Sequence, residues 1–296
     1  MTPWALVGDI LRRPLNQGHP MKALGRFAAF QAGSRMAPGP IITPFVGDSV
    51  LAVSHGMPGA TFNVYAGLQD FEDMGFLLHV LRKNDLFIDV GSNVGTYTVL
   101  ASAVVGAKCI AFEPVPSTFR KLCRNIRLND TSDLCELHNE GLSSREGELV
   151  FTSDEDCKNR VVNQAVAPTQ NTVTVAVSTL NAIVGNRLPT LIKIDVEGFE
   201  LEVLRGGDLV FKSASLLGVI TELNGSGRDY GFEDATVFAQ LLEWGVLAYK
   251  YDPLSRNLRP VQEGFGTGNT LFVRDISKVR ALVAAAPRFC VLGKQF

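Results

Sequence analysis

The feature that most constrains the fold is a glycine-containing turn that directly follows a short apolar segment. Residues 86–96 read Leu-Phe-Ile-Asp-Val-Gly-Ser-Asn-Val-Gly-Thr, and a helical pattern continues to residue 105. An apolar segment of this length that leads through glycines into a helix is typical of a strand-turn-helix unit in an α/β sheet. The two glycines are four residues apart, and no Lys-Ser/Thr pair follows them. The turn is therefore neither a G-x-G-x-x-G dinucleotide motif nor a P-loop.

Apolar segments alternate with helical ones over the rest of the chain. Strands are predicted at residues 86–90, 108–112, 135–139, 148–151, 172–177, 191–196, 217–223, 247–251 and 270–273. Helices are predicted at residues 70–81, 96–105, 117–128, 199–204, 234–244 and 276–286. This alternation predicts a mostly parallel sheet with helices on both faces. In such sheets a ligand binds beyond the carboxyl ends of the strands.

Residues 1–65 are predicted to form an N-terminal extension to a domain at residues 66–296. The prolines at positions 14, 20, 38 and 40 break its helical segments, and two strands are expected at 50–53 and 61–65. Residues 1–44 hold five basic residues and one acid. We expect this segment to serve as a lid, a substrate contact or the contact of a homodimer.

Composition excludes several classes of function. The formal net charge is -2 and the pI about 6.1, which argues against a nucleic-acid partner. No apolar run approaches the roughly 18 residues of a membrane span. The five cysteines are irregularly spaced, without a zinc or disulfide pattern, and the basic residues follow the first apolar stretch instead of preceding it. These features predict a cytoplasmic protein.

Two acidic residues at strand ends predict a nucleoside site. Asp89 ends the first strand, and its carboxylate would repel a pyrophosphate but attract an ammonium and a sulfonium group. Glu113 follows the second strand, 22 residues after Gly91. That spacing is close to the ~20 residues expected for an acid that binds a ribose.

A third stretch, residues 191–200, reads Leu-Ile-Lys-Ile-Asp-Val-Glu-Gly-Phe-Glu. Lys193 and Asp195 lie in or next to an apolar strand, where charges are unfavourable unless they are paired or used. Glu197 and Glu200 follow, and the helix dipole is expected to explain Glu200. It does not explain Asp195, which we expect at the carboxyl end of the strand, beside the nucleoside crevice.

Residues 87–96, 111–114 and 191–200 together resemble the FkbM-type methyltransferases, a family of Rossmann-like S-adenosylmethionine enzymes. Residues 221–222 and 269–272 also resemble the later strands of that family, and the similarity covers roughly residues 70–275. The resemblance implies a class I methyltransferase sheet of seven strands, mostly parallel with the last strand antiparallel. It also implies methyl transfer from S-adenosylmethionine, with S-adenosylhomocysteine as product, usually to a hydroxyl of a sugar or natural product.

The resemblance further implies roles for individual residues. The methionine part of the cofactor would be held by the first turn, that is by Asp89, Gly91, Ser92, Asn93, Gly95 and Thr96. The ribose would be bound by Glu113, with Pro114 beside it. The adenine would lie near Glu140, Gly141 and Leu142.

Methyl transfer to a neutral hydroxyl requires a base within hydrogen-bond reach. We expect Asp195 to be that base or to orient the acceptor, with Glu197 second. Lys193 would pair with one of these carboxylates or be structural, and His138 is not favoured. Asp195, Glu197 and Glu222 would suit Mg²⁺ if they converged, but nothing in their spacing requires a metal, and none is predicted.

Two other functions compete with an O-methyltransferase acting on a small-molecule hydroxyl. One is a non-catalytic nucleoside-binding or assembly subunit with the same fold. The other is an NAD-dependent oxidoreductase, which the missing third glycine and Asp89 disfavour. A nitrogen acceptor also remains open. Acceptor specificity is expected to reside in residues 1–60 and in a polar excursion at residues 152–171.

Overall fold

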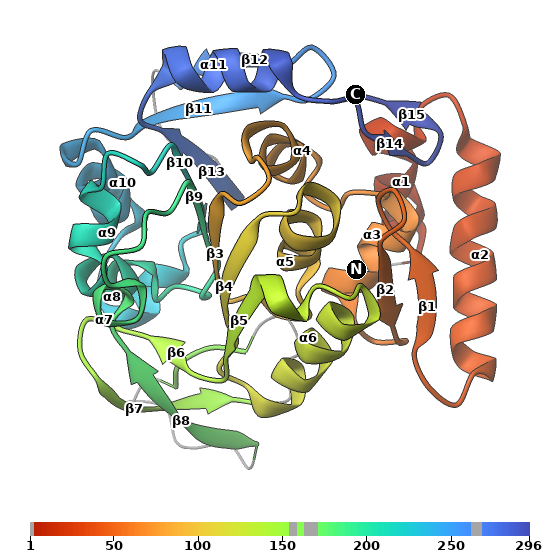
Figure 1. The fold of residues 1–296 in the computed structure, drawn as a ribbon. Helices are drawn as coiled ribbons and strands as arrows, with labels where there is room; N and C mark the ends of the chain where they lie inside the picture. The colour runs from red at the N-terminus through yellow and green to blue at the C-terminus, as the bar shows by residue number, and fades with distance from the viewer. Residues whose placement is uncertain (1–2, 154–158, 163–170, 262–267) are drawn as a thin grey trace.

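A mixed eight-stranded sheet forms the centre of the protein (Figure 1). The computed structural model describes residues 3–153, 159–162, 171–261 and 268–296. The strands of the sheet are β3 (Leu86–Val90), β4 (Lys108–Phe112), β5 (Cys135–His138), β9 (Leu191–Ile194), β10 (Gly218–Leu223), β11 (Leu247–Asp252), β12 (Asn257–Pro260) and β13 (Gly268–Val273). Their order is β12-β11-β13-β10-β9-β3-β4-β5. Part of the predicted excursion at 152–171 lies outside the described residues.

Five adjacent strands, from β5 to β10, are parallel, and β13 runs antiparallel to both β10 and β11. The prediction of a mostly parallel sheet whose last strand is antiparallel is therefore confirmed. One strand, β12, was not predicted and pairs with β11 at the sheet edge. Its sequence, Asn-Leu-Arg-Pro, buries only Leu258 and ends in a proline, as an edge strand allows.

Helices cover both faces of this sheet because neighbouring residues of each buried strand point to opposite sides. On β3, Phe87 packs with α4 and α11, whereas Ile88 packs with the cluster that contains α8, α9 and α10. The helices around this sheet are α4 (Phe71–Val80), α5 (Thr96–Val99), the π-helix η2 (Leu100–Val105), α6 (Pro116–Leu128), α7 (Leu180–Val184), α8 (Glu200–Gly206), α9 (Asp208–Lys212), α10 (Asp234–Glu243) and α11 (Ile276–Ala285). No helix of the described chain is long and apolar enough to span a membrane.

Smaller elements extend this core. A three-stranded sheet of order β6-β8-β7 is built from β6 (Gly141–Leu142), β7 (Gly147–Thr152) and β8 (Thr172–Ser178). The remaining elements are the turns η3 (Ser132–Leu134) and η5 (Ser226–Tyr230) and the terminal hairpin of β14 (Cys290–Val291) and β15 (Lys294–Gln295). Lys294 on β15 donates to the carbonyl of Pro14 (2.8 Å), which ties the C-terminal hairpin to the N-terminal residues.

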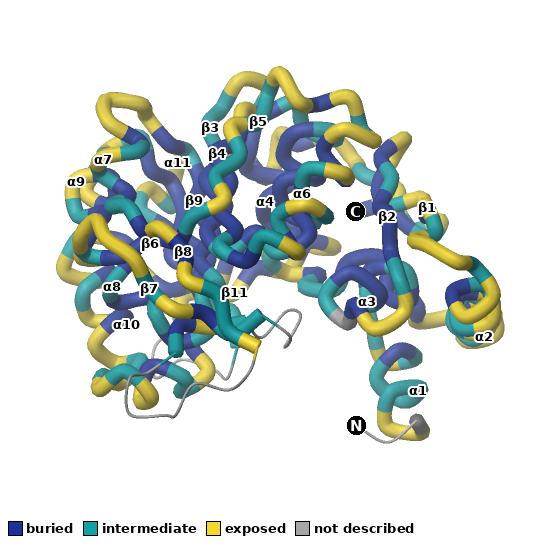
Figure 2. The backbone as a smooth tube through the Cα atoms, turned by 90° about the horizontal axis from the view of Figure 1, so that it is seen from below, coloured by how far each residue is buried: buried dark blue, intermediate teal, exposed yellow. Residues whose placement is uncertain are grey.

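The N-terminal residues form a group of helices and one hairpin beside α6 (Figure 2). Its elements are α1 (Pro3–Arg12), η1 (Pro14–Asn16), α2 (Pro20–Met36), β1 (Ile41–Pro44), β2 (Val50–Val53) and α3 (Pro58–Ala66). The side chain of Asn125 on α6 accepts from the amide of Ala52 (2.8 Å), and Asn129 accepts from the amide of Val50 (2.9 Å). These bonds fix the hairpin against α6.

The strand predicted at residues 61–65 is wrong, because this segment lies inside helix α3. The β-branched Thr61 and Val64 favoured a strand. Pro58 begins the helix and Gly67, with φ 83°, follows its end, which is the usual placement of these two residues in helices. Tyr65 and Ala60 are buried on the helix face toward the N-terminal core.

Candidate active site

A cleft of about 430 Å³ opens beyond the carboxyl ends of β3, β4 and β9. Nine of the predicted site residues line it: Asp89, Gly91, Ser92, Asn93, Thr96, Glu113, Pro114, Asp195 and Glu197. The other lining residues are Asp9, Arg13, Gly59, Phe62, Gln69, Asp70, Met74, Val94, Tyr97, Phe151, Asn159, Lys193, Val196 and Glu222. Four predicted cofactor residues, Gly95, Glu140, Gly141 and Leu142, are not part of this lining, and their assignment stays a prediction.

The carboxylate of Asp89 is buried at the floor of the cleft with one oxygen unpaired. Its Oδ2 accepts from the hydroxyl of Thr98 (2.6 Å), while Oδ1 has no hydrogen-bond partner among the described residues. Burial raises the pKa of Asp89, and the nearby Lys193 opposes that rise. Because a buried acceptor without a donor is unfavourable, Oδ1 is suited to receive a hydrogen bond from a bound molecule.

The glycines of the first turn are required by packing against the protein itself. Gly91 has φ 78°, and a Cβ there would lie 1.9 Å from the carbonyl oxygen of Asp195. Gly95 has φ 85°, and a Cβ there would lie 2.5 Å from Cδ1 of Leu122. Only a glycine allows the turn after β3 to approach the backbone after β9 this closely. The role of Gly95 in holding the methionine part of the cofactor stays a prediction.

Glu113 binds the backbone of the same turn. Its Oε2 accepts from the amide of Asn93 (3.0 Å), and its Oε1 accepts from the amide of Val115 (2.9 Å). Burial raises the pKa of Glu113 to about 7, although these two amide bonds act in the opposite direction. The Asn139 side chain donates to the carbonyl of Glu113 (2.9 Å) and so fixes its backbone. Glu113 thus faces the cleft beside Asn93, where a sugar hydroxyl would compete for its oxygens.

Lys193 is a buried cation surrounded by acids. Its Nζ lies 2.8 Å from Oδ2 of Asp195 and 4.8 Å from the centre of the Tyr97 ring. In the sheet Lys193 pairs with Asp89 on the neighbouring strand β3. Burial alone would lower the pKa of Lys193, but Asp195, Asp89 and Asp70 raise it above its ordinary value. The lysine therefore stays charged and holds the Asp195 carboxylate in place.

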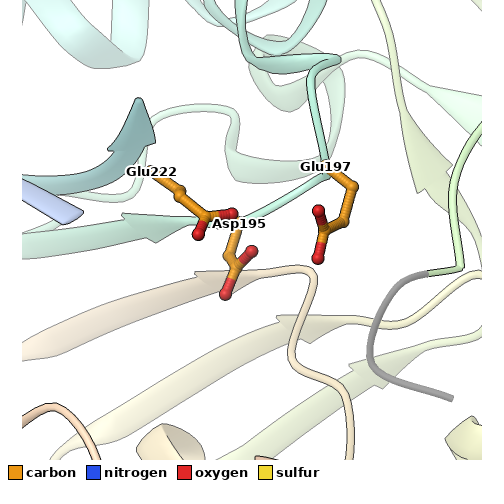
Figure 3. Close-up of side chains that lie close together, drawn as sticks. All are labelled: Asp195, Glu197 and Glu222. Atoms are coloured by element: carbon orange, nitrogen blue, oxygen red, sulfur yellow. The ribbon is translucent and has the colours of Figure 1, made fainter. Parts of the chain in front are cut away.

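Asp195, Glu197 and Glu222 converge at the mouth of the cleft (Figure 3). One oxygen of each carboxylate lies within 4.8 Å of the others. Burial, followed by repulsion from Asp195 and Glu197, raises the pKa of Glu222 to about 8. Glu222 therefore carries a proton at neutral pH, and that proton reduces the repulsion. Oxygen ligands of this kind would also suit Mg²⁺, and the absence of a metal stays a prediction.

Glu200 has a structural role, as its position near a helix start predicted. It is buried, and its Oε1 accepts from the amides of Gly198 (3.1 Å) and Val196 (3.3 Å). These bonds hold the turn that carries Glu197, whose backbone is left-handed with φ 52°. Glu200 thereby supports the carboxylate group without lining the cleft.

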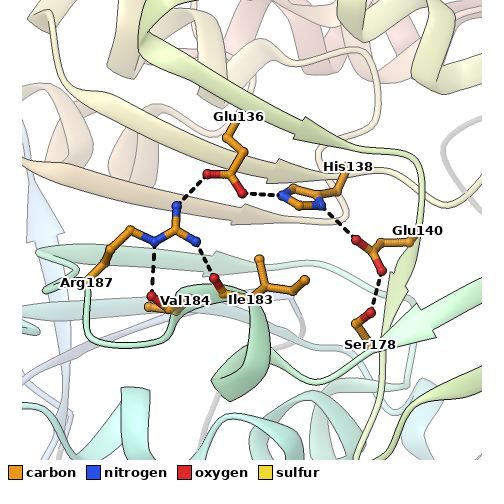
Figure 4. Close-up of polar contacts among 7 residues, drawn as sticks. All are labelled: Glu136, His138, Glu140, Ser178, Ile183, Val184 and Arg187. Atoms are coloured by element: carbon orange, nitrogen blue, oxygen red, sulfur yellow. Dashed lines mark hydrogen bonds and ion pairs between the residues drawn. The ribbon is translucent and has the colours of Figure 1, made fainter.

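The third predicted strand end forms a separate polar network (Figure 4). His138 lies between two carboxylates, with Nε2 2.7 Å from Glu136 and Nδ1 2.7 Å from Glu140. Its ring stacks on Phe112 at 4.9 Å. The network lies outside the cleft lining, and each oxygen of Glu140 is bonded, one to His138 and the other to Ser178.

Sequence reasoning missed several residues of the cleft wall. Tyr97 donates to Asp70 (3.0 Å), and both lie at the starts of helices that the sequence did predict. Asp9, Arg13 and Phe62 come from the N-terminal extension. Helix starts after parallel strands face the ligand edge of the sheet, which would have identified Tyr97. No local pattern identifies the three N-terminal residues, because their approach to the cleft depends on tertiary packing.

The strand order and the antiparallel β13, together with a cleft at the carboxyl ends of β3, β4 and β9, define a Rossmann-like class I methyltransferase fold. The methyltransferase FkbM domain matches residues 89–251, and the chain belongs to this family. Membership implies S-adenosylmethionine as methyl donor and S-adenosylhomocysteine as product.

Two named methyltransferases and one solved structure are similar to parts of the chain. The chain is 32% identical over 156 residues to hexuronic acid methyltransferase AglP of Haloferax volcanii. The aligned region covers 50% of this chain and 59% of AglP. The chain is also 29% identical over 171 residues to methyltransferase sdnD of Sordaria araneosa, and this alignment covers 47% of this chain and 66% of sdnD. The chain thus matches less than two thirds of the length of either relative. A solved methyltransferase from Geobacter sulfurreducens is 13% identical with a TM-score of 0.40, covering 84% of this chain and 88% of that one.

Proposed function

We propose that the chain is an S-adenosylmethionine-dependent O-methyltransferase that acts on a hydroxyl of a sugar or a natural-product-like small molecule. The observation that carries the proposal is the placement of Asp89 and Asp195 in one cleft, with Lys193 next to both. One carboxylate is suited to the cofactor and the other to the acceptor.

The residues at the cleft floor fit the cofactor. The unpaired Oδ1 of Asp89 is an acceptor for the ammonium of the methionine part. Asn93 and Thr96 of the first turn line the same cleft, and Glu113, which also lines it, would accept hydrogen bonds from the ribose hydroxyls. Seven carboxyl groups and two basic side chains line the cleft, so its charge favours a positively charged cofactor. When bound, S-adenosylmethionine supplies a methyl group on a positively charged sulfur.

The protein's own part in the chemistry is to position the acceptor and remove its proton. Lys193 donates to Oδ2 of Asp195. Among the described residues no side chain or backbone group bonds to Oδ1, so this oxygen can accept a hydrogen bond from a hydroxyl in the cleft. Asp195 accepts the proton of that hydroxyl as the oxygen becomes nucleophilic. Holding the acceptor close to the donor supplies much of the remaining rate enhancement. Glu197 lies near enough to orient the acceptor.

The acceptor class rests on the relatives and on the cleft itself. One relative is named for a hexuronic acid, which is a sugar with several oxygen atoms that can be methylated. Arg13 and Phe62 from the N-terminal extension and Phe151 from β7 also line the cleft. We assign the binding of the methyl acceptor to these residues. Residues 1–65 would therefore contribute to acceptor specificity.

Calorimetric titration with S-adenosylmethionine, S-adenosylhomocysteine and NAD tests the proposal. We expect the two sulfur nucleosides to bind and NAD not to bind. A screen of sugar and phenolic hydroxyl acceptors, read out by the release of S-adenosylhomocysteine, then tests catalysis. Binding of NAD alone would refute the proposal. Binding of the cofactor without turnover of any acceptor would instead favour a non-catalytic nucleoside-binding subunit.

A further inference from the structure

A second pocket, of about 210 Å³, lies between the start of α6 and the segment after β2, and it is positively charged. Its cations are Arg120, Lys121 and Arg124, all on α6. The rest of its wall consists of Ala52, Ser54, Met57 and Ser117, so no acid lines it.

Arg120 and Arg124 are not explained by the stability of the fold. In the part of the chain that the structure describes, neither Arg120 nor Arg124 forms an ion pair or a side-chain hydrogen bond with another residue. Both are exposed, and they lie four positions apart on one helix face, where like charges repel. The first turn of α6 contains no acid and no side-chain cap, so the positive end of the helix adds to the same charge. Most other arginines do have partners; Arg187 and Arg256, for example, bind carbonyls or carboxylates.

The pocket adjoins the candidate active site through two short stretches of chain. Met57 lines the pocket, and Gly59, two residues later, lines the cleft. On the other side Pro114 lines the cleft and Ser117 lines the pocket. The pocket and the cleft are therefore only two or three residues apart along each of these stretches.

The cleft is rich in acids and the pocket on α6 is basic, so a molecule that binds to both must carry its anionic group at the pocket on α6. The cleft holds many more acids than bases, so an anionic group is repelled there. The α6 pocket holds only basic and neutral groups, and an arginine guanidinium is well suited to bind an oxyanion through paired N–H donors.

We propose that the α6 pocket binds an oxyanion group, a phosphate ester or a carboxylate, which the methyl acceptor carries at a distance from the hydroxyl that is methylated. The inference rests on the proposed function for the identity of the acceptor. The anion site itself does not, because it follows from the charge and geometry of α6.

Anion binding is tested by calorimetry at low ionic strength, with inorganic phosphate, inorganic diphosphate and glucuronate as separate probes. The proteins compared are the full chain, the double variant R120Q/R124Q and the control R127Q/R288Q. The control removes the same charge from exposed residues outside the pocket. We expect at least tenfold weaker binding in R120Q/R124Q and less than a twofold change in the control. Preference for the phosphates or for glucuronate identifies the source of the oxyanion.

Equal weakening in both variants, or no binding of any probe to the unmodified chain, would overturn the anion site. Titration of the same proteins with S-adenosylhomocysteine shows separately whether the chain binds the cofactor product. The absence of an anion site is thereby distinguished from the absence of methyltransferase function. Selective anion binding without S-adenosylhomocysteine binding would leave the anion site intact and refute the methyltransferase proposal. The link to the acceptor is tested by kinetics: R120Q/R124Q should raise the KM of an anionic acceptor at least tenfold but not that of its neutral analogue. Equal effects on both would refute the link.

Discussion

The Nζ of Lys193 lies 2.8 Å from Oδ2 of Asp195, and this pair connects the floor of the cleft to its mouth. Lys193 is almost fully buried, whereas the Asp195 side chain is one third exposed. The lysine also faces the ring of Tyr97 and lies beside Asp89 in the sheet. The buried lysine keeps the Asp195 carboxylate oriented by bonding to Oδ2, so that Oδ1 can bind a molecule in the cleft.

The Asp195→Asn substitution is expected to lower turnover by about 100-fold or more, because general-base catalysis contributes about 10²–10⁴-fold. An amide retains the shape of the side chain but cannot accept the proton of the acceptor. Affinity for S-adenosylhomocysteine should stay within about twofold, since Asp89 and Glu113 provide the expected cofactor contacts. Steady-state kinetics and calorimetry measure the two quantities. The exposed Asp133→Asn is the matched control, and full turnover in D195N would exclude Asp195 as the base.

The Glu113→Ala substitution is expected to weaken S-adenosylhomocysteine binding by at least about tenfold, since hydrogen bonds to a charged group are worth about 1.5–3 kcal/mol. The variant loses the expected contact to the ribose and also the bonds that hold the amides of Asn93 and Val115. Calorimetry gives the affinity, and thermal unfolding shows whether the loop change affects the whole fold. The exposed Glu146→Ala should bind like the unmodified chain. Unchanged affinity in E113A would argue against the ribose assignment.

Stability should fall with rising pH, and Glu222 should account for part of the fall. Its pKa is raised from 4.5 to about 8, so the folded state binds a proton that the unfolded state releases above about pH 4.5. The stabilisation is fully present below that pH and is lost as pH rises to about 8. Burial raises the pKa of Glu113 and of Glu200 to about 7, which acts in the same direction.

The Glu222→Gln substitution isolates this effect, because glutamine is neutral at every pH. The difference in Tm between E222Q and the unmodified chain should grow in favour of E222Q between about pH 5 and 8 and then level off. Differential scanning fluorimetry across this range measures it, with the exposed Glu146→Gln as control. A pH-independent difference would mean that the pKa of Glu222 is not raised in the folded protein.

Much of the sheet and nine of the residues that line the cleft could be predicted, because both depend on local sequence. A strand such as β3 is a short apolar segment, and the side chains at its carboxyl end are identified by position alone. The failures have physical reasons. Residues 61–65 contain β-branched side chains that favour a strand, yet packing of Tyr65 in the N-terminal core selects a helix. β12 exists only because it can pair with β11 at the sheet edge.

The role of Gly91 illustrates what the sequence could not provide. Its need for glycine comes from the carbonyl of Asp195, more than one hundred residues away in sequence. The Gly91→Ala substitution should therefore destabilise the fold beyond the ~1–2 kcal/mol of a left-handed backbone alone. Gly225→Ala is the matched control, because Gly225 has φ 89° and no atom within 4 Å of an added Cβ. Chemical denaturation of both variants measures the difference, and equal losses would show that the close approach to Asp195 does not restrict the residue.

Arg13 provides the test of whether the N-terminal extension contributes to the acceptor site. Its guanidinium donates to the carbonyl of Gln69 (2.9 Å) and to the carboxylate of Asp9 (3.0 Å). The guanidinium carbon Cζ lies 4.5 Å from the centre of the Phe62 ring. The Arg13→Ala substitution removes this wall of the cleft without touching Asp89 or Glu113. It should raise the KM of the acceptor by about tenfold, as loss of a charged hydrogen bond predicts.

The neighbouring Arg12→Ala is the matched control, because Arg12 is exposed, does not line the cleft and carries the same charge. Its KM should be unchanged, and both variants should bind S-adenosylhomocysteine as tightly as the unmodified chain. If R13A and R12A had the same KM, the extension would not contact the acceptor. The bonds of Arg13 to Gln69 and Asp9 would then serve stability, and a lower Tm of R13A than of R12A would report that role.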